Sequence, residues 1–168
     1  MDHAHHHAHH AQDHQHSAPV AGAQLNATAF RATLHCLSGC AVGEVLGMIL
    51  GTAWGLSNGA TVALSVLLAF AFGYTFTFLP LLRSGMALRS ALAVAFAADT
   101  ASITLMEIVD NAIMLVIPGA MGAGLDEVLF WGSLALSLVL AGAAAFPLNR
   151  FLIQRGQGHA LAHAEHSH

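Results

Sequence analysis

Four apolar stretches, each long enough to cross a lipid bilayer, constrain this chain more than any other feature. A hydrocarbon core about 30 Å thick requires roughly 20 apolar residues per helix. Stretches of this kind lie near residues 34–57, 60–82, 88–117 and 127–148. The breaks between them carry turn-forming sequences, namely Ser57-Asn58-Gly59, Arg83-Ser84-Gly85 and Pro118-Gly119. The sequence therefore predicts an all-α membrane protein, folded as a four-transmembrane-helix bundle.

The composition leaves little room for a soluble domain. Of the 168 residues, 56% are hydrophobic and only 8% are charged, whereas about a quarter of the residues are charged in ordinary soluble domains. We predict a transmembrane domain at 26–155, between disordered His-rich tails at 1–25 and 156–168. There is no basic surface for nucleic acid. No motif of a soluble catalytic site is present either, so we expect a protein of the lipid bilayer that is not an enzyme.

The arginines predict the orientation of the bundle. The chain has no lysine, and its five arginines are Arg31, Arg83, Arg89, Arg150 and Arg155. In the predicted topology all five fall on one side of the membrane, and the loops on the other side carry no basic residue. The positive-inside rule then places both termini in the cytoplasm.

Histidines are concentrated in the two tails. The chain has 13 histidines, and all but His35 belong to the following set: His3, His5, His6, His7, His9, His10, His14, His16, His159, His163, His166 and His168. An expression tag is the alternative explanation, but the run is interrupted and a second cluster closes the chain. Neutral imidazoles bind Zn, Cu and Ni, so we expect these tails to gather metal ions.

The first apolar stretch carries two lines of residues that each repeat every four positions. One line consists of Gly39, Gly43, Gly47, Gly51 and Gly55. Glycines at this spacing let another helix approach closely inside a membrane. Its partner is either the small-residue line of the fourth stretch (Ser133, Ser137, Ala141 and Ala145) or a second copy of the chain in a homo-oligomer.

The other line has the side chains of a metal site. It consists of Cys36, Cys40, Glu44 and Met48, with His35 beside its cytoplasmic end. Thiolate, thioether and imidazole suit Cu(I), while the carboxylate keeps Zn, Ni and Co open. The alternative is that both cysteines are small buried apolar residues.

The third stretch places acids on one helical face. At 100° per residue, Asp99, Ser102, Met106 and Asp110 share a narrow face, with Glu107 and Met114 on its flank. An uncompensated charge at mid-membrane costs about 2.5–3.5 kcal/mol. With no buried basic partner, such acids bind cations, carry protons or stay protonated. For Glu107 and Asp110 a polar cap at the outer interface is an equal alternative, and we expect Glu44 and Asp99 to face each other at similar depth.

Several short motifs together resemble a known family. They are His35-Cys36-x-x-Gly39-Cys40-x-x-Gly43-Glu44, Phe72-Gly73-Tyr74, Ala98-Asp99-Thr100, Met106-Glu107-Ile108-x-Asp110-Asn111, Pro118-Gly119-Ala120-Met121, Phe130-Trp131, Pro147-x-Asn149-Arg150 and Arg155-Gly156-x-Gly158-His159. The chain resembles, over about residues 30 to 163, the bacterial membrane proteins grouped as domain of unknown function four-three-nine-six. That resemblance implies a compact four-helix unit in the bacterial inner membrane and names no substrate.

We therefore expect a multi-pass transition-metal channel or carrier, with Cu(I) favoured and import the better guess for its direction. The candidate metal ligands are His35, Cys36, Cys40, Glu44, Met48, Asp99, Met106, Glu107 and Asp110. The alternatives are a redox protein, or a metal-sensing or assembly protein that uses Cys36 and Cys40 without moving ions.

Overall fold

The computed structural model describes residues 22–155, and all of its long elements are helices. They are α1 (Gly22–Ala53), α2 (Asn58–Arg83), α3 (Leu88–Val116), the short 3-10 helix η1 (Ala120–Gly122) and α4 (Val128–Gln154). Each of the four α-helices is long and apolar enough to cross a membrane. The predicted all-α, four-helix fold is confirmed. The predicted tails lie outside the described residues, except that residues 22–25 already belong to α1.

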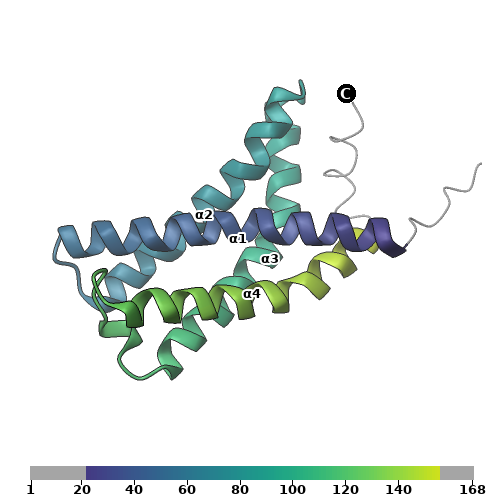
Figure 1. Ribbon diagram of the computed structural model, residues 1–168. Helices are drawn as coiled ribbons and strands as arrows, with labels where there is room; N and C mark the ends of the chain where they lie inside the picture. Colours follow the sequence, from purple (N-terminus) through teal and green to yellow (C-terminus); the bar gives the residue numbers. More distant parts are fainter. Residues whose placement is uncertain (1–21, 156–168) are drawn as a thin grey trace, which may run out of the picture.

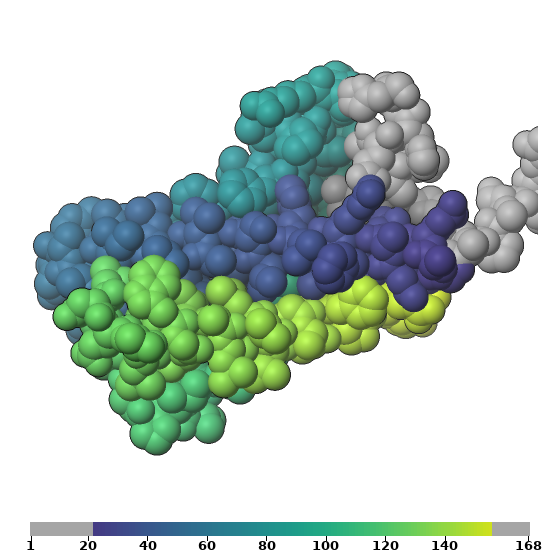
Figure 2. Space-filling view, viewed as in Figure 1, coloured from purple at the N-terminus to yellow at the C-terminus, as the bar shows by residue number. Residues whose placement is uncertain are grey.

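The four helices form two antiparallel pairs that cross each other. α1 and α4 lie side by side along their lengths, and α2 and α3 form a hairpin behind them that projects away at its turn (Figure 1). The space-filling view shows α1 lying against α4, with the α2–α3 hairpin rising above α1 (Figure 2). The start of α1 and the end of α4 lie at one end, and η1 and the α1–α2 turn lie at the other.

The outer surface of the bundle is apolar. Large hydrophobic side chains such as Leu67, Ile108, Leu115 and Val139 are exposed on α2, α3 and α4. Soluble proteins rarely expose apolar surface on this scale, whereas a lipid bilayer covers it without cost. Together with the four spanning helices, this surface makes the chain a multi-pass membrane protein.

Two helices extend further than the apolar stretches predict, and their extensions pack on each other. α1 begins at Gly22 instead of residue 34, and α4 passes Pro147 and ends at Gln154. Leu25, Ala29 and Ile153 form a small apolar cluster. Beside it Asn149 Nδ2 donates to Thr33 Oγ1 (2.9 Å), and Arg150 Nε donates to Asn26 Oδ1 (2.8 Å). Contacts between these two polar extensions stabilise them as helices. Hydropathy alone does not predict the extensions, because it measures the composition of one segment and not its contacts with another.

The glycine line of α1 packs against α2. A Cβ atom on Gly39 would lie 2.6 Å from Gly73 Cα, and one on Gly51 would lie 2.5 Å from the Thr61 side chain. Gly43 and Gly47 contact Ala69 and Ser65 in the same way. The contact surface on α2 is therefore a second period-four line of small residues, Thr61, Ser65, Ala69 and Gly73.

This contact corrects three expectations. The glycine line does not pack on the small-residue line of α4. The same face is covered by α2 of the same chain, so it is not free to form a homo-oligomer. Gly55 does not belong to the line either, because it lies in the turn after α1 with a positive φ of 63°, a conformation that glycine adopts without steric cost.

Candidate functional site

A cavity opens into the bundle at the end formed by the α1–α2 turn and η1. Its volume is about 300 Å³, and all five helical elements contribute to its wall. Its lining runs from buried acids on α1 and α3 to exposed residues of the two connections, Asn58 and Gly122 among them. At this outer end Asn58 Nδ2 donates to the carbonyl oxygen of Met121 (3.4 Å), which ties α2 to η1.

Three carboxyl groups lie together in the deep part of this cavity. They belong to Glu44 of α1 and to Glu107 and Asp110 of α3, and only 5–6% of each residue is exposed. Asp110 lies beside both glutamates. It accepts a hydrogen bond from Ser137 Oγ of α4. The Cys40 thiol lies beside Glu107, but among the described residues no carboxyl oxygen of Glu44 or Glu107 has a hydrogen-bond partner of good geometry. Buried polar atoms without partners are rare in native structures, so these four oxygens mark the site.

A second polar cluster surrounds Asp99, about two helical turns from the cavity acids along α3. Cys36 Sγ of α1 donates to Asp99 Oδ1 (3.6 Å), and the Thr77 hydroxyl of α2 and His35 of α1 lie close to the same carboxyl. Ser102 lies beside Cys36. Asp99 is 2% exposed, and its other oxygen has no partner. We call these five residues the inner polar cluster.

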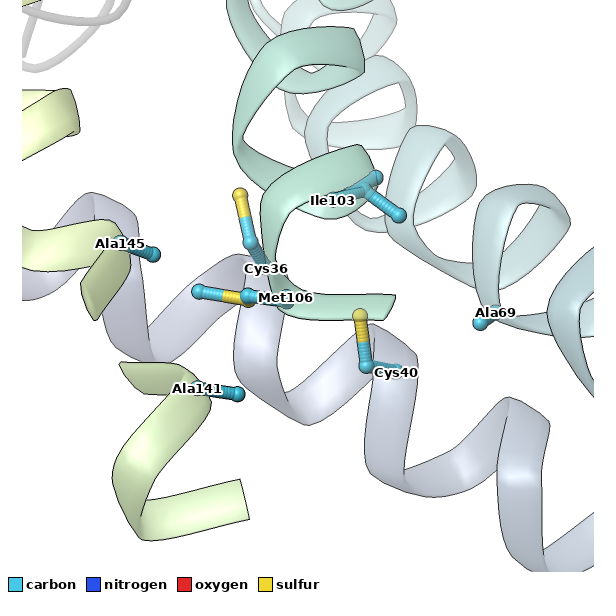
Figure 3. Close-up of a cluster of buried hydrophobic side chains, with 7 residues drawn as sticks. All are labelled: Cys36, Cys40, Ala69, Ile103, Met106, Ala141 and Ala145. Carbon is cyan, nitrogen blue, oxygen red and sulfur yellow. The ribbon is translucent and has the colours of Figure 1, made fainter. Parts of the chain in front are cut away.

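An apolar layer separates the inner polar cluster from the cavity. Cys40, Ala69, Ile103 and Met106 form this layer together with Ala141 and Ala145 of α4. Cys36 of the inner polar cluster packs against it. Figure 3 shows both cysteines extending from α1 toward α3, with Ala141 and Ala145 on the facing side of α4. Both thiols are free and buried. The small-residue line of α4 therefore contacts the cysteine face of α1 rather than its glycine face.

The structure divides the nine candidate metal ligands among these three regions. Glu44, Met48, Glu107 and Asp110 line the cavity. His35, Cys36 and Asp99 belong to the inner polar cluster, and Cys40 and Met106 to the apolar layer. Within residues 22–155 no three His, Cys, Asp or Glu side chains come together as a metal-binding group. A metal ion shared by Cys36 and Cys40 stays a prediction.

The expected facing pair of Glu44 and Asp99 is wrong. Glu44 lies beside Asp110, whereas Asp99 contacts Cys36. Cys36 lies level with Asp99, and from there α1 and α3 both continue toward the end that holds η1 and the α1–α2 turn. Glu44, about two turns further along α1, therefore meets Glu107 and Asp110, about two and three turns further along α3. The alternative of a polar cap at the outer interface does not fit Glu107 and Asp110, because both side chains are buried in the bundle.

Some residues of the site were missed from the sequence. The period-four line of small residues suggests that Ser137 only packs against another helix, yet its hydroxyl donates a hydrogen bond to Asp110. Met114 was placed only on the flank of the acidic face, and Met121 and Asn58 were given no role, although all three line the cavity. The only signal for Ser137 was its place in a period-four line, which does not distinguish a packing serine from a hydrogen-bond donor.

Comparison with known families identifies the family to which the chain belongs. Residues 25–158 match the family described as Domain of unknown function (DUF4396). The chain belongs to this family. No curated protein and no solved structure matches it. The matched region of this DUF4396 protein runs from the start of α1 past the end of α4, so it contains the cavity, the apolar layer and the inner polar cluster.

Proposed function

We propose that this DUF4396 protein carries a metal cation across the membrane and binds it in the cavity between α1, α3 and η1. The observation that carries the proposal is the pair of buried glutamates, Glu44 and Glu107, whose carboxyl oxygens have no hydrogen-bond partner of good geometry within residues 22–155. Their polar neighbours are another acid, Asp110, and the Cys40 thiol. Carboxylate oxygens are good ligands for divalent cations. A bound cation supplies the partner that these oxygens lack.

The energetics of the bilayer support a cation at this position. An ionised carboxyl at mid-membrane costs about 2.5–3.5 kcal/mol on insertion scales, and three carboxyls share this cavity. The chain has no lysine. Its five arginines lie in the first part of α1, at the end of α2, at the start of α3 and at the end of α4, which are the ends of these helices away from η1. A concave site lined by acids with apolar walls also concentrates cations from solution.

The inner polar cluster extends the proposed route through the bundle. From Glu44 to Cys36 the path along α1 covers about two turns, or roughly 12 Å. We propose that a cation leaving the cavity passes the apolar layer and reaches Asp99 and His35. Passage requires the side chains of that layer to move apart, because Cys40 and Met106 are almost completely buried there.

We further propose that the cavity faces the outside of the bacterial inner membrane. The arginines favour a cytoplasmic location for both termini, which puts η1 on the opposite side. A membrane potential that is negative inside then favours cation entry by about 2.3 kcal/mol per charge per 100 mV. The histidines of the two tails would meet the ion on the cytoplasmic side and retain it.

Cation flux into liposomes tests the proposal. The full chain is reconstituted with an ion-sensitive dye inside the vesicles, and uptake of Zn²⁺ and of Ca²⁺ is recorded. We expect Glu44→Gln and Glu107→Gln each to lower uptake at least tenfold, which equals about 1.4 kcal/mol, because the amide keeps the shape and removes the charge. Asp126→Asn is the matched control, since Asp126 is an exposed acid at the same end of the bundle that does not line the cavity.

The same assay separates the competing functions. Uptake that is absent in the wild type, while the purified protein still binds metal, would favour a metal-sensing or assembly role. Proton movement without metal movement, measured with a pH dye inside the vesicles, would mean that the acids carry protons. Equal uptake by the two Gln variants and the wild type would remove the cavity from the route.

A further inference from the structure

Three methionine side chains from three different elements line the same cavity as the acids. Met48 belongs to α1, Met114 to α3 and Met121 to η1. Met48 is far from the other two in the sequence, and Met114 and Met121 lie on either side of the break between α3 and η1, so no single helical periodicity produces this grouping. The three methionines line the same space as Glu44 and Glu107.

The methionines are distributed differently from the other large apolar side chains. The exposed large hydrophobic residues of the bundle are Phe, Leu, Val, Ile and Trp, and none of them is a methionine. The described residues contain Met48, Met86, Met106, Met114 and Met121. Three of these five line the cavity that holds the unpartnered carboxyl oxygens of Glu44 and Glu107. Most of the described methionines therefore lie at the site, and none is among the exposed large hydrophobic side chains.

Packing alone gives an incomplete account of this grouping. Met48 packs beside Phe130 and Leu134, and methionine is well suited to filling irregular gaps. Leucine would fill such gaps with similar volume and a better-defined shape. The cavity nevertheless stays open, with about 300 Å³ unfilled. What methionine adds there is a polarisable sulfur that can act as a ligand.

We infer that the cavity takes a thiophilic transition-metal ion in preference to an alkali or alkaline-earth ion, and that Met48, Met114 and Met121 provide this selectivity. The inference rests on the proposed function, because it names the substrate class of the same site. Carboxylates alone suit Ca²⁺ and Mg²⁺, whereas thioethers favour soft metals. The cavity of about 300 Å³ is also large enough to hold water molecules beside an ion.

In this inference the preference for soft metal ions comes from the methionine thioethers of the cavity and not from the thiols of Cys36 and Cys40. The Cys36 thiol donates to Asp99. The Cys40 thiol lies beside Glu107, but neither cysteine lines the cavity. A soft ligand set in the cavity therefore requires neither thiol. Selection of the ion takes place at the outer end of the route, before the apolar layer.

Competition between Cd²⁺ and Ca²⁺ tests the inference, because these ions have the same charge and nearly the same radius but differ in softness. The full chain and a Met48→Leu/Met114→Leu/Met121→Leu variant are compared for uptake of each ion into liposomes. Binding of radioactive Cd²⁺ in excess Ca²⁺ is measured by equilibrium dialysis as a second readout. Every variant carries the same tails and cysteines, so differences between variants come from the substituted sulfur atoms.

We expect the triple variant to lose at least tenfold in its preference for Cd²⁺ over Ca²⁺, measured as the ratio of the two uptake rates. Met86→Leu, at the α2–α3 turn away from the cavity, is the matched control and should keep the wild-type preference. Met121→Leu alone, in the short η1 helix, gives a smaller loss and serves if the triple variant is unstable.

The outcomes separate this inference from the proposed function. A triple variant with the wild-type preference for Cd²⁺ in both readouts overturns the inference, and the methionines then only pack. If the wild type transports neither ion, the proposed function fails. The dialysis comparison still decides whether the methionine sulfurs bind the soft ion.

Discussion

The contact between Cys36 and Asp99 shows how a single side chain stabilises this core. The thiol hydrogen is directed at Asp99 Oδ1 across 3.6 Å, and both residues are almost fully buried. Removing the donor would leave the carboxyl with one fewer partner where water cannot replace it. An unsatisfied buried acceptor costs about 1–3 kcal/mol.

The residue-scale prediction therefore compares two substitutions at Cys36. Cys36→Ala should lower the free energy of unfolding in detergent by about 1–3 kcal/mol, measured by denaturant titration. Cys36→Ser keeps a donor at the same place and should lose clearly less. Equal losses in the two variants would mean that Cys36 contributes only volume to the core.

Ser137 carries a second prediction at the same scale. It donates to Asp110, whereas Ser133, one turn earlier on α4, is buried without contacting that acid. Ser137→Ala should destabilise the fold by about 1–3 kcal/mol and reduce cation uptake, because Asp110 loses the bond that orients it. Ser133→Ala is the matched control in the same flux and unfolding assays, and a larger effect at Ser133 would contradict this role.

At the scale of the elements, the α1–α2 contact is the closest approach in the bundle. Its two surfaces consist of glycines on α1 and small residues on α2, and a Cβ atom on Gly43 would overlap the backbone of Ala69. Backbone atoms cannot move aside as a flexible side chain does. The helices would have to separate along their whole contact to admit a methyl group.

Gly43→Ala should therefore destabilise the protein by about 1–3 kcal/mol, the usual cost of overpacking. Gly132→Ala is the matched control, since Gly132 also lies within a helix but has open space where its Cβ would be. At that position alanine should be neutral or slightly stabilising. Thermal unfolding of both variants in detergent measures the difference. Equal melting temperatures would show that the close α1–α2 contact at Gly43 does not contribute to stability.

At the scale of the whole molecule, the direction of each helix separates the arginines from the acid-lined cavity. The start of α1 and the end of α4 lie together, while η1 and the α1–α2 turn lie at the other end (Figure 1). The positive-inside rule then predicts that both termini face the cytoplasm. Single cysteines introduced as Val20→Cys and Ala160→Cys should be protected from an impermeant thiol reagent in intact cells, and Asp126→Cys should react.

The native thiols do not interfere with this measurement because both are buried. Labelling of the two terminal positions from opposite sides would contradict an even number of crossings. Labelling of both from outside would invert the proposed direction of the cavity.

Local patterns in the sequence were enough to predict the helices and their buried faces. Length and hydropathy predict the four spans, because a bilayer of constant thickness imposes a minimum apolar run. The buried face of α3, with Asp99, Ser102, Met106 and Asp110, follows from helical periodicity alone. The polar extensions of α1 and α4 could not be predicted this way, since they are stabilised by contacts with each other.

Only the tertiary structure decided which faces meet and in what register. Two lines of small residues, one on α2 and one on α4, were equally suitable partners for the glycines of α1, because a surface without side chains accepts any close-packing helix. Periodicity also leaves the axial shift between two helices open. That shift places Cys36 beside Asp99 and brings Glu44 to Asp110. Residues on three separate elements therefore form one cavity of acids and thioethers, which no local pattern in the chain specifies.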